Sequence, residues 1–335
     1  MYKSYGYTLL LSAILAQASF GAITYSNGFS SVAAYTHTNS DSVVSFDWSG
    51  TGQLFYMTSS GYPDINVWRD NGGSPQAVYS EPSNYAGASV TAIGNYIYFN
   101  DSTGGGTQNI WKFGPTNGSP ATSLISTAAN STIAGHNGDM FITGDGNGNF
   151  VNEHFYTALD GNGDLTGSIV NLGENFGSSG PIVFDALGDM YYAPGFGDKS
   201  IYKWTAAQVA DAVAGTSTLP TSGVLWYDYS ADFADQSGAT GMAMDADGNL
   251  VVSITDFVND SVLVQFGVDG IGDFDGGLTL MLSSNTRLGD VRNYNGDVYV
   301  SADNAVLQII PEPGSTGLIF GLLAGLSVMA IRRRK

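Results

Sequence analysis

The sequence predicts an all-β chain built from six similar units, and three observations support this prediction. The chain has 45 Gly and 19 Tyr, and only four of its 30 acidic residues are Glu, whereas Asp, a residue of turns, supplies the rest. A glycine turn followed by an alternating strand recurs six times, and a second strand with a bulky central residue recurs in register with it. Hydrophobic residues make up 43% of the chain, which is enough to form a core and argues against disorder.

The two repeat series define the units. The glycine turns read TGQLFYM, IGNYIYF, NGDMFIT, LGDMYYA, DGNLVVS and NGDVYVS, at Gly52, Gly94, Gly138, Gly188, Gly248 and Gly296, with steps of 42, 44, 50, 60 and 48 residues. The bulky strands are Val67–Arg69, Ile110–Lys112, Phe155–Thr157, Ile201–Lys203, Leu263–Gln265 and Val306–Gln308. Units of roughly 45 residues with four short strands each are typical of propeller blades, so we expect a six-bladed β-propeller over residues 19–310.

The expected blades are 43–84, 85–130, 131–178, 179–235, 236–287 and 288–310. The sixth blade ends before a fourth strand, whereas residues 22–36 have no unit of their own. We therefore expect this N-terminal segment to pair onto the sixth blade as its outer strand and close the ring. The long step in blade four contains TAAQVADAVAG, residues 205–215, whose apolar spacing predicts a short helix between the third and fourth strands.

The repeats resemble those of NHL-repeat and gluconolactonase-like six-bladed propellers, best in TGMAMDADGNLVVSITD, residues 240–256. This resemblance concerns the fold, because such turn and strand patterns recur in propellers of different function.

The charge of the chain limits its partners. Lys and Arg number 11, and residues 19–310 carry only six of them against 29 acidic residues, a formal charge of −23. Such a surface repels phosphate backbones, so we expect no nucleic-acid partner, and it favours cations and cationic partners. The absence of Cys excludes disulfides, Cys-ligated zinc and thiol catalysis.

The N-terminus predicts export. Lys3 precedes the apolar run from Leu9 to Ala16, and small residues follow in the pattern that signal peptidases accept. We interpret residues 1–18 as a signal peptide. The alternative is a membrane anchor, but eight apolar residues are too short to span a bilayer.

The C-terminus predicts a sorting signal. Residues 315–331 carry no charge and would form a helix of roughly 25 Å, and the basic cluster after them should stay cytoplasmic. A Pro-Glu-Pro tripeptide, a short apolar helix and a terminal Arg cluster together resemble the PEP-CTERM sorting signal, over residues 311–335. The motif residues are Pro311, Glu312, Pro313, Arg332, Arg333 and Arg334.

This resemblance implies a place for the protein and a partner. PEP-CTERM proteins belong to Gram-negative bacteria that make exopolysaccharide, and an exosortase, a transpeptidase-like membrane enzyme, processes them near the tripeptide. The expected course is a transient C-terminal anchor in the inner membrane, then the outer surface or the extracellular matrix. Exopolysaccharide or an envelope protein is then the expected ligand, and the alternative is a plain tail anchor.

Four Asp residues follow the second strand of their units, on the face where propellers usually bind ligands: Asp101, Asp145, Asp256 and Asp303. In gluconolactonase-like enzymes, carboxylates near the axis hold a divalent metal, which makes these residues candidate axial ligands. The early Glu ligand of that family is missing, because the corresponding positions are Ser45, Phe46 and Asp47. The alternative is that each Asp caps its own loop through backbone N–H groups.

Calcium is the cofactor that the remaining Asp residues suggest. LDGNGDLTG offers Asp160, Asn162 and Asp164 at alternate positions, which points successive oxygens at one hard cation, and VDGIGDFDGG offers Asp269, Asp273 and Asp275. The first loop lacks the expected Gly and the bidentate Glu, since Leu165 and Leu172 stand there. Metal-free hairpin turns are the alternative at both loops, because Asp-Gly suits hairpin geometry by itself.

Two functions remain open. No nucleophile elbow, phosphate loop or zinc-protease motif occurs, and the histidines are His37, His136 and His154. The first hypothesis is a non-enzymatic module of the envelope or matrix that binds polysaccharide, cations or a protein. The second is a metal-dependent propeller enzyme, a lactonase or lyase acting on a sugar derivative.

Aromatic side chains in the loops and chain-end strands could stack on sugar rings or could serve as core wedges between blades: Tyr25, Tyr35, Tyr62, Tyr85, Phe176, Tyr227 and Phe233.

Overall fold

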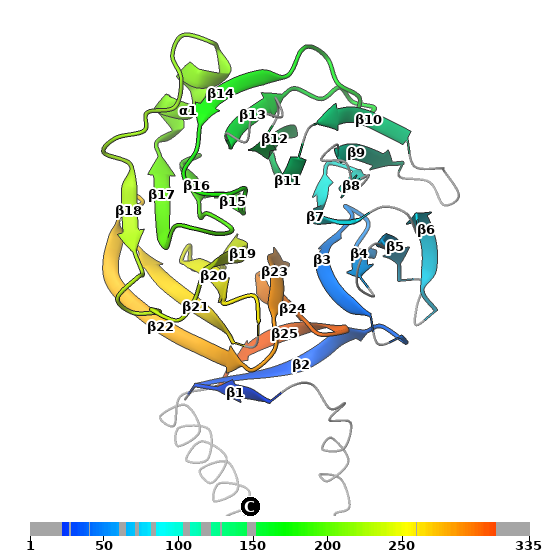
Figure 1. Cartoon of the computed structure of the whole chain (residues 1–335), viewed down its shortest axis with the longest axis vertical. Helices are drawn as coiled ribbons and strands as arrows, with labels where there is room; N and C mark the ends of the chain where they lie inside the picture. The colour runs from blue at the N-terminus through cyan, green and yellow to red at the C-terminus, as the bar shows by residue number, and fades with distance from the viewer. Residues whose placement is uncertain are drawn as a thin grey trace, which may run out of the picture.

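The computed structural model forms a ring of six antiparallel sheets around a central axis (Figure 1). It describes residues 22–312 except 27, 40, 60–64, 71–73, 82–84, 103–107, 115–121, 128, 146–151 and 259. The signal sequence at 1–18 and the apolar segment at 315–331 lie outside the described residues. No helix in the described part of the chain is long and apolar enough to cross a membrane.

Each sheet is one blade, and its strands follow the chain from the axis outward (Figure 1). Blade one has β3 (Ser42–Trp48), β4 (Leu54–Ser59), β5 (Ile65–Arg69) and β6 (Gln76–Glu81); blade two has β7 (Tyr85–Ile93), β8 (Tyr96–Ser102), β9 (Gln108–Phe113) and β10 (Thr122–Thr127); blade three has β11 (Ala129–His136), β12 (Asp139–Asp145), β13 (Glu153–Thr157) and β14 (Val170–Glu174). Blade four has β15 (Ile182–Phe184), β16 (Met190–Tyr192), β17 (Ser200–Trp204) and β18 (Leu225–Asp228); blade five has β19 (Gly238–Met244), β20 (Leu250–Thr255), β21 (Ser261–Val268) and β22 (Phe274–Ser284); blade six has β23 (Leu288–Tyr294), β24 (Asp297–Ala302) and β25 (Ala305–Pro311). The predicted six-bladed propeller is therefore confirmed.

The N-terminal segment divides between two blades. β2 (Phe29–Thr36) pairs antiparallel with β25, so it is the outer strand of the sixth sheet. β1 (Ile23–Tyr25) pairs instead with the end of β22, as a fifth strand of blade five. The expectation that all of residues 22–36 would pair with blade six was wrong for β1. The long β22 offers an unpaired edge that β1 covers, and a turn at Gly28 (φ +98°) separates the two short strands.

The helix expected in blade four is confirmed as α1 (Ala206–Val213), between β17 and β18. Thr205 is its N-cap and forms a capping box with Gln208, which satisfies backbone donors that the first turn leaves free. Val209 and Ala212 are buried against the interface between blades three and four. The regularly spaced apolar residues of this segment therefore pack against the core.

The glycine of the recurring turn has the same conformation in all six units. Each lies between the first and second strands of its blade with φ between +61° and +91°, a region that residues with a Cβ adopt at a cost. In blades three and six, the preceding Asn137 and Asn295 are also left-handed, as a two-residue type I′ hairpin requires. Glycine therefore recurs at this position of the sequence because the backbone of each turn requires a positive φ there.

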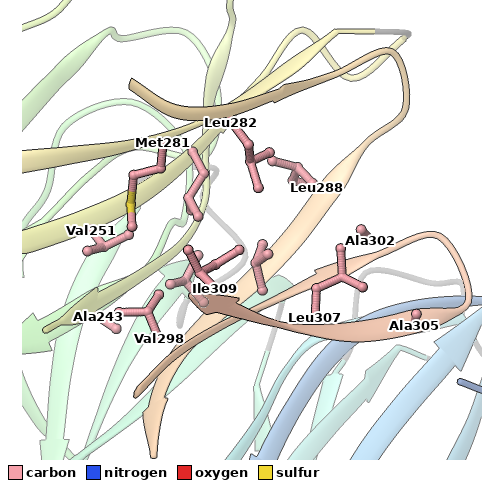
Figure 2. Close-up of a cluster of buried hydrophobic side chains, with 13 residues drawn as sticks. Ala243, Val251, Met281, Leu282, Leu288, Val298, Ala302, Ala305, Leu307 and Ile309 are labelled. Atoms are coloured by element: carbon pink, nitrogen blue, oxygen red, sulfur yellow. The ribbon is translucent and has the colours of Figure 1, made fainter. Parts of the chain in front are cut away.

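The core lies between blades. The described residues form six clusters of buried apolar side chains, one at each junction of neighbouring blades. Figure 2 shows the cluster between blades five and six, to which Met281 of β22 and Ile309 of β25 contribute. Burying one such side chain stabilises the fold by about 1.5–3 kcal/mol, so each blade depends on both neighbours.

Candidate functional site

The propeller has two ends with different loops. Because strands alternate in direction within each blade, the turns between first and second strands lie at one end, with the third-to-fourth connections. We call this the turn end. The connections between blades and the second-to-third loops lie at the other end, which we call the loop end.

Four Asp residues were predicted to face the axis at the loop end. Asp101 is fully buried at the end of β8. Its carboxylate accepts hydrogen bonds from the backbone N (3.2 Å) and Nδ2 (3.1 Å) of Asn109, and from the hydroxyl of Tyr79. This side chain therefore joins its own loop to the outer strand of blade one.

The other three Asp residues end or follow the second strands of blades three, five and six. Oδ1 of Asp256 accepts from the backbone N of Val258 (2.7 Å) and of Asp260 (2.9 Å), which closes the loop between β20 and β21. Asp303 has φ +48° in the turn between β24 and β25, and Asp145 is the last residue of β12. The described residues include no group of three His, Asp or Glu that could hold a metal ion. A cation site on these four residues stays a prediction.

The proposed calcium loops are hydrogen-bonded turns. Oδ1 of Asp160 accepts from the backbone N of Asn162 (2.8 Å) and of Asp164 (2.9 Å), and these bonds lower the pKa of Asp160. The carboxylate of Asp164 forms an ion pair with Lys112. This cation occupies an oxygen that calcium would need.

The second loop repeats this arrangement. Oδ1 of Asp269 accepts from the backbone N of Ile271 and of Asp273, both at 2.9 Å. Asp273 lies 3.4 Å from Nζ of Lys203, and Asp275 accepts from the backbone N of Gly277 at 2.6 Å. Calcium binding at either loop stays a prediction.

One recurring turn requires Asp at five positions. It begins at Asp160, Asp185, Asp245, Asp256 and Asp269. In each case Oδ1 accepts the N–H groups two and four residues later at 2.7–2.9 Å, and the Asp N–H donates to the carbonyl four residues later. A Glu carboxylate, one methylene further from the backbone, cannot close this small ring.

A polar cavity lies on the axis at the turn end. Its volume is about 310 Å³, and it is lined by the first strands of all six blades near their C-terminal ends. This lies at the end opposite to the predicted one. Its volume falls within the range of about 300–1,000 Å³ that is usual for ligand pockets.

Arg292 and Asp47 line one wall of this cavity, and the buried Asp290 pairs with Arg292. Arg292 of β23 donates to Asp290 Oδ2 (2.9 Å) and to the carbonyl oxygen of Val90 (2.8 Å). Its Nε lies 3.8 Å from Asp47 Oδ2, which also accepts from the backbone N of Ala92 at 2.8 Å. The network therefore ties blade six to blades one and two.

Burial perturbs both carboxyl groups. It raises the pKa of Asp290 to about 6, although Arg292 and the hydroxyl of Ser45 (2.6 Å from Asp290 Oδ2) act in the opposite direction. Burial also raises the pKa of Asp47, against the field of Arg292. The side chains of Asp47 and Arg292 remain 18% and 16% exposed, so both can reach a ligand.

The facing wall is largely apolar. His136 stacks on Phe184 with ring centroids 4.0 Å apart, and Met242 and Met244 continue this surface. Burial lowers the pKa of His136, which favours the neutral imidazole. Nδ2 of Asn293 donates to the carbonyl oxygen of Met244 at 2.9 Å and closes the wall. A ligand would thus meet hydrogen-bonding groups on one side and rings on the other.

Sequence reasoning did not identify this site. Asp47 was considered only as a position where a family ligand is missing, and Asp290 and Arg292 were not considered. The available signal was the presence of charged residues inside otherwise apolar first strands, in SFDW and GDVRN.

The aromatic residues suggested as sugar stackers mostly pack inside. Five are partly buried against the clusters between blades: Tyr25, Tyr35, Phe176, Tyr227 and Phe233. Phe176 stacks on Tyr202 with centroids 3.8 Å apart. Tyr62 and the side chain of Tyr85 lie outside the described part. The core-wedge alternative is therefore favoured for these five.

Comparison with known proteins shows the fold. No family model matches the chain, and no curated protein matches it. Among solved structures it is similar to a carbohydrate-active enzyme of family AA12 from Trichoderma reesei, with a TM-score of 0.56 and 12% identity over 89% of this chain and 99% of that one. It is also similar to the PQQ-bound aldose sugar dehydrogenase of Streptomyces coelicolor, with a TM-score of 0.53 and 9% identity over 86% and 100%. A "putative gluconolactonase" gives a TM-score of 0.53 and 10% identity over 85% and 93%.

These identities are low, so the similarity establishes a six-bladed propeller and carries no activity.

Proposed function

We propose that this chain is an exported propeller of the cell envelope or extracellular matrix, and that it binds a polysaccharide without converting it. The observation that carries this proposal is the axial cavity, where a guanidinium and a carboxylate face a wall of rings and methionines. Hydroxyl groups of a sugar both donate and accept hydrogen bonds, and the C–H face of its ring packs on aromatic surface. A sugar unit therefore suits both walls.

The chain ends support the location. The signal-like residues 1–18 and the PEP-CTERM-like residues 311–335 agree with export, processing by an exosortase-type enzyme and a membrane anchor that serves only before processing. Exopolysaccharide is the glycan that this location offers.

A second candidate is an enzyme that acts on a sugar derivative. One observation favours it: the pKa of Asp290 is raised to about 6, in the range where a carboxylic acid can donate or accept a proton near neutral pH. Asp290 pairs with Arg292, which lines the axial cavity, so one experiment addresses both functions.

The experiment measures retention of the full chain on exopolysaccharide of the producing organism, first with calcium and then with EDTA. The test variant is Ala92→Phe, which adds a large ring at the lining of the cavity and removes no charged group. Because Ala92 also contacts the apolar cluster between blades one and two, the melting temperature of the variant is measured as a check of its fold. The matched control is Ala77→Phe, on the exposed outer strand of blade one. We expect the test variant to bind about tenfold more weakly and the control to bind like the original protein.

The outcomes separate the alternatives. Equal retention of the original protein and Ala92→Phe would refute binding in the axial cavity. New reducing ends or unsaturated sugar products would favour the enzyme. Loss of retention with EDTA would support cation sites in the Asp loops.

A further inference from the structure

An exposed aromatic pair lies at the loop end, away from the axial cavity. Phe196, in the loop between β16 and β17, is 60% exposed, and Phe257, between β20 and β21, is 37% exposed. Their ring centroids are 6.1 Å apart with the planes at 58°, and the neighbouring Val258 is 73% exposed. Large apolar side chains that gather on a surface indicate a binding site.

The backbone at Phe257 is strained. Its φ is +64°, a left-handed conformation that is unfavourable for a bulky residue and costs about 1–3 kcal/mol. The backbone N of Phe257 donates to Thr255 Oγ1 at 3.0 Å, and the Asp256 turn fixes the next residue. The left-handed conformation lowers the stability of the loop and holds the ring of Phe257 outward. Packing in the core does not require such a conformation.

The loop of Phe196 is held on both sides. Its carbonyl oxygen accepts from the backbone N of Ser178 (3.1 Å), and that of Pro194 accepts from Ala239 (2.9 Å). A Cβ at Gly238 would lie 2.1 Å from the carbonyl oxygen of Gly195, so the loop fits only against glycine. Both rings are thus presented on fixed backbone, which lowers the entropy lost on binding.

A cation without a carboxylate partner adjoins the rings. The guanidinium carbon of Arg287, in the connection from β22 to β23, lies 5.3 Å from the ring centroid of Phe257. In the described part of the chain Lys112, Lys203 and Arg292 form ion pairs with Asp, whereas Arg287 forms none and is exposed. This guanidinium favours an anionic group at this point of the surface, although the net charge of −19 repels anions at long range.

We infer that Phe196, Phe257 and Arg287 form a second carbohydrate site, specific for an acidic sugar unit such as a uronate. The rings would pack on the C–H face of the pyranose, and the guanidinium would bind its carboxylate through two parallel N–H···O bonds. A protein partner fits less well, because a stable interface needs about 800 Å² per partner and this patch has three apolar side chains.

This inference rests on the proposed glycan-binding function and adds a site and a ligand class to it. The two sites lie at opposite ends of the propeller, so occupation of one does not block the other.

The test uses the full chain and two probes, polygalacturonate and its fully methyl-esterified form, with binding followed by calorimetry. Phe257→Gly removes the ring and also the strain, so we expect binding of both polymers to weaken about tenfold while the melting temperature is unchanged or higher. A purely structural role of Phe257 predicts instead a lower melting temperature. Arg287→Gln should weaken binding of the charged polymer about tenfold and leave binding of the ester unchanged.

The axial variant Ala92→Phe is the control for the other site, and we expect it to bind polygalacturonate like the original protein. If Ala92→Phe loses binding and Phe257→Gly keeps it, this inference is overturned and the axial proposal stands. If the original protein binds neither polymer, as expected of a surface for a protein partner, the acidic-sugar site is overturned too.

Discussion

His154 provides a direct test of how this propeller tolerates a buried ionisable group. It lies in β13, is 1% exposed, and packs edge-on against Tyr192 (centroids 4.8 Å apart) and Trp204 (5.1 Å). Neither ring nitrogen has a hydrogen-bond partner within the described structure. Burial lowers its pKa to about 3, because the imidazolium would lie in an apolar environment with no acceptor.

The stability of the protein should therefore depend on pH through this residue. The unfolded chain binds a proton near pH 6.5, and the folded protein does not until about pH 3. Between these values the unfolded state holds more protons, so the free energy of unfolding falls as pH decreases, by about 1.36 kcal/mol per pH unit. From pH 7.5 to pH 4.5 the loss from His154 alone is about 2.7 kcal/mol.

The substitution His154→Phe keeps a flat ring and removes the titration. We expect the free energy of unfolding of the variant, minus that of the original protein, to increase by about 2.7 kcal/mol between pH 7.5 and pH 4.5. Urea unfolding at several pH values measures this difference. Asp47 and Asp290 have raised pKa values, which change the free energy of unfolding with pH in the opposite direction. These and the other titrating groups are present in both proteins, so their contributions cancel in the difference.

A packing defect in the variant would shift its whole curve and leave the slope of the difference unchanged. His136→Phe is the control, because that imidazole is only partly buried and accepts a hydrogen bond from Asn137, so a smaller slope is expected. Parallel pH profiles for His154→Phe and the original protein would refute the reasoning.

Two further predictions concern the axis and the turns. Arg292→Met should lower the free energy of unfolding by about 3–5 kcal/mol at pH 7, because it leaves the buried Asp290 and the partly buried Asp47 without a cation, and by less at pH 4.5, where Asp290 is protonated. Urea unfolding measures this, with the exposed Arg287→Gln as the control; equal losses at both pH values would contradict it. Asp245→Ala should cost about 1–3 kcal/mol through two lost backbone hydrogen bonds, and Asp245→Glu nearly as much. Thermal melting measures both, and a Glu variant as stable as the original would show that the short side chain is not required.

The propeller could be predicted from the sequence because its determinants are local. The turn at Gly248 needs a positive φ, and the side chains of the strand after it alternate between the two neighbouring blade junctions, Leu250 on one side and Val251 on the other. The same holds for α1, where a capping residue and an apolar spacing lie within one segment. The Asp turns were half predicted: loop capping was one of two alternatives, and the hydrogen bonds of Asp160 and Asp256 support it.

Long-range contacts could not be predicted in this way. β1 was assigned to the wrong blade, because any short apolar strand satisfies any open sheet edge. Ser45 and Asp290, joined at 2.6 Å on the axis, lie 245 residues apart, and no local pattern links them. Sequence reasoning therefore placed the expected site at the loop end, whereas the axial cavity lies at the turn end.

The sequence by itself determined the number of blades, the turns and the acidic character of the surface, because each follows from residues close together in the chain. Only the tertiary structure decided which side chains meet. It brings Asp47 to Arg292 across the ring closure, and it brings Phe196 next to Phe257 on neighbouring blades. The physical reason is that ring closure sets these contacts, and closure depends on the packing of all six blade junctions at once.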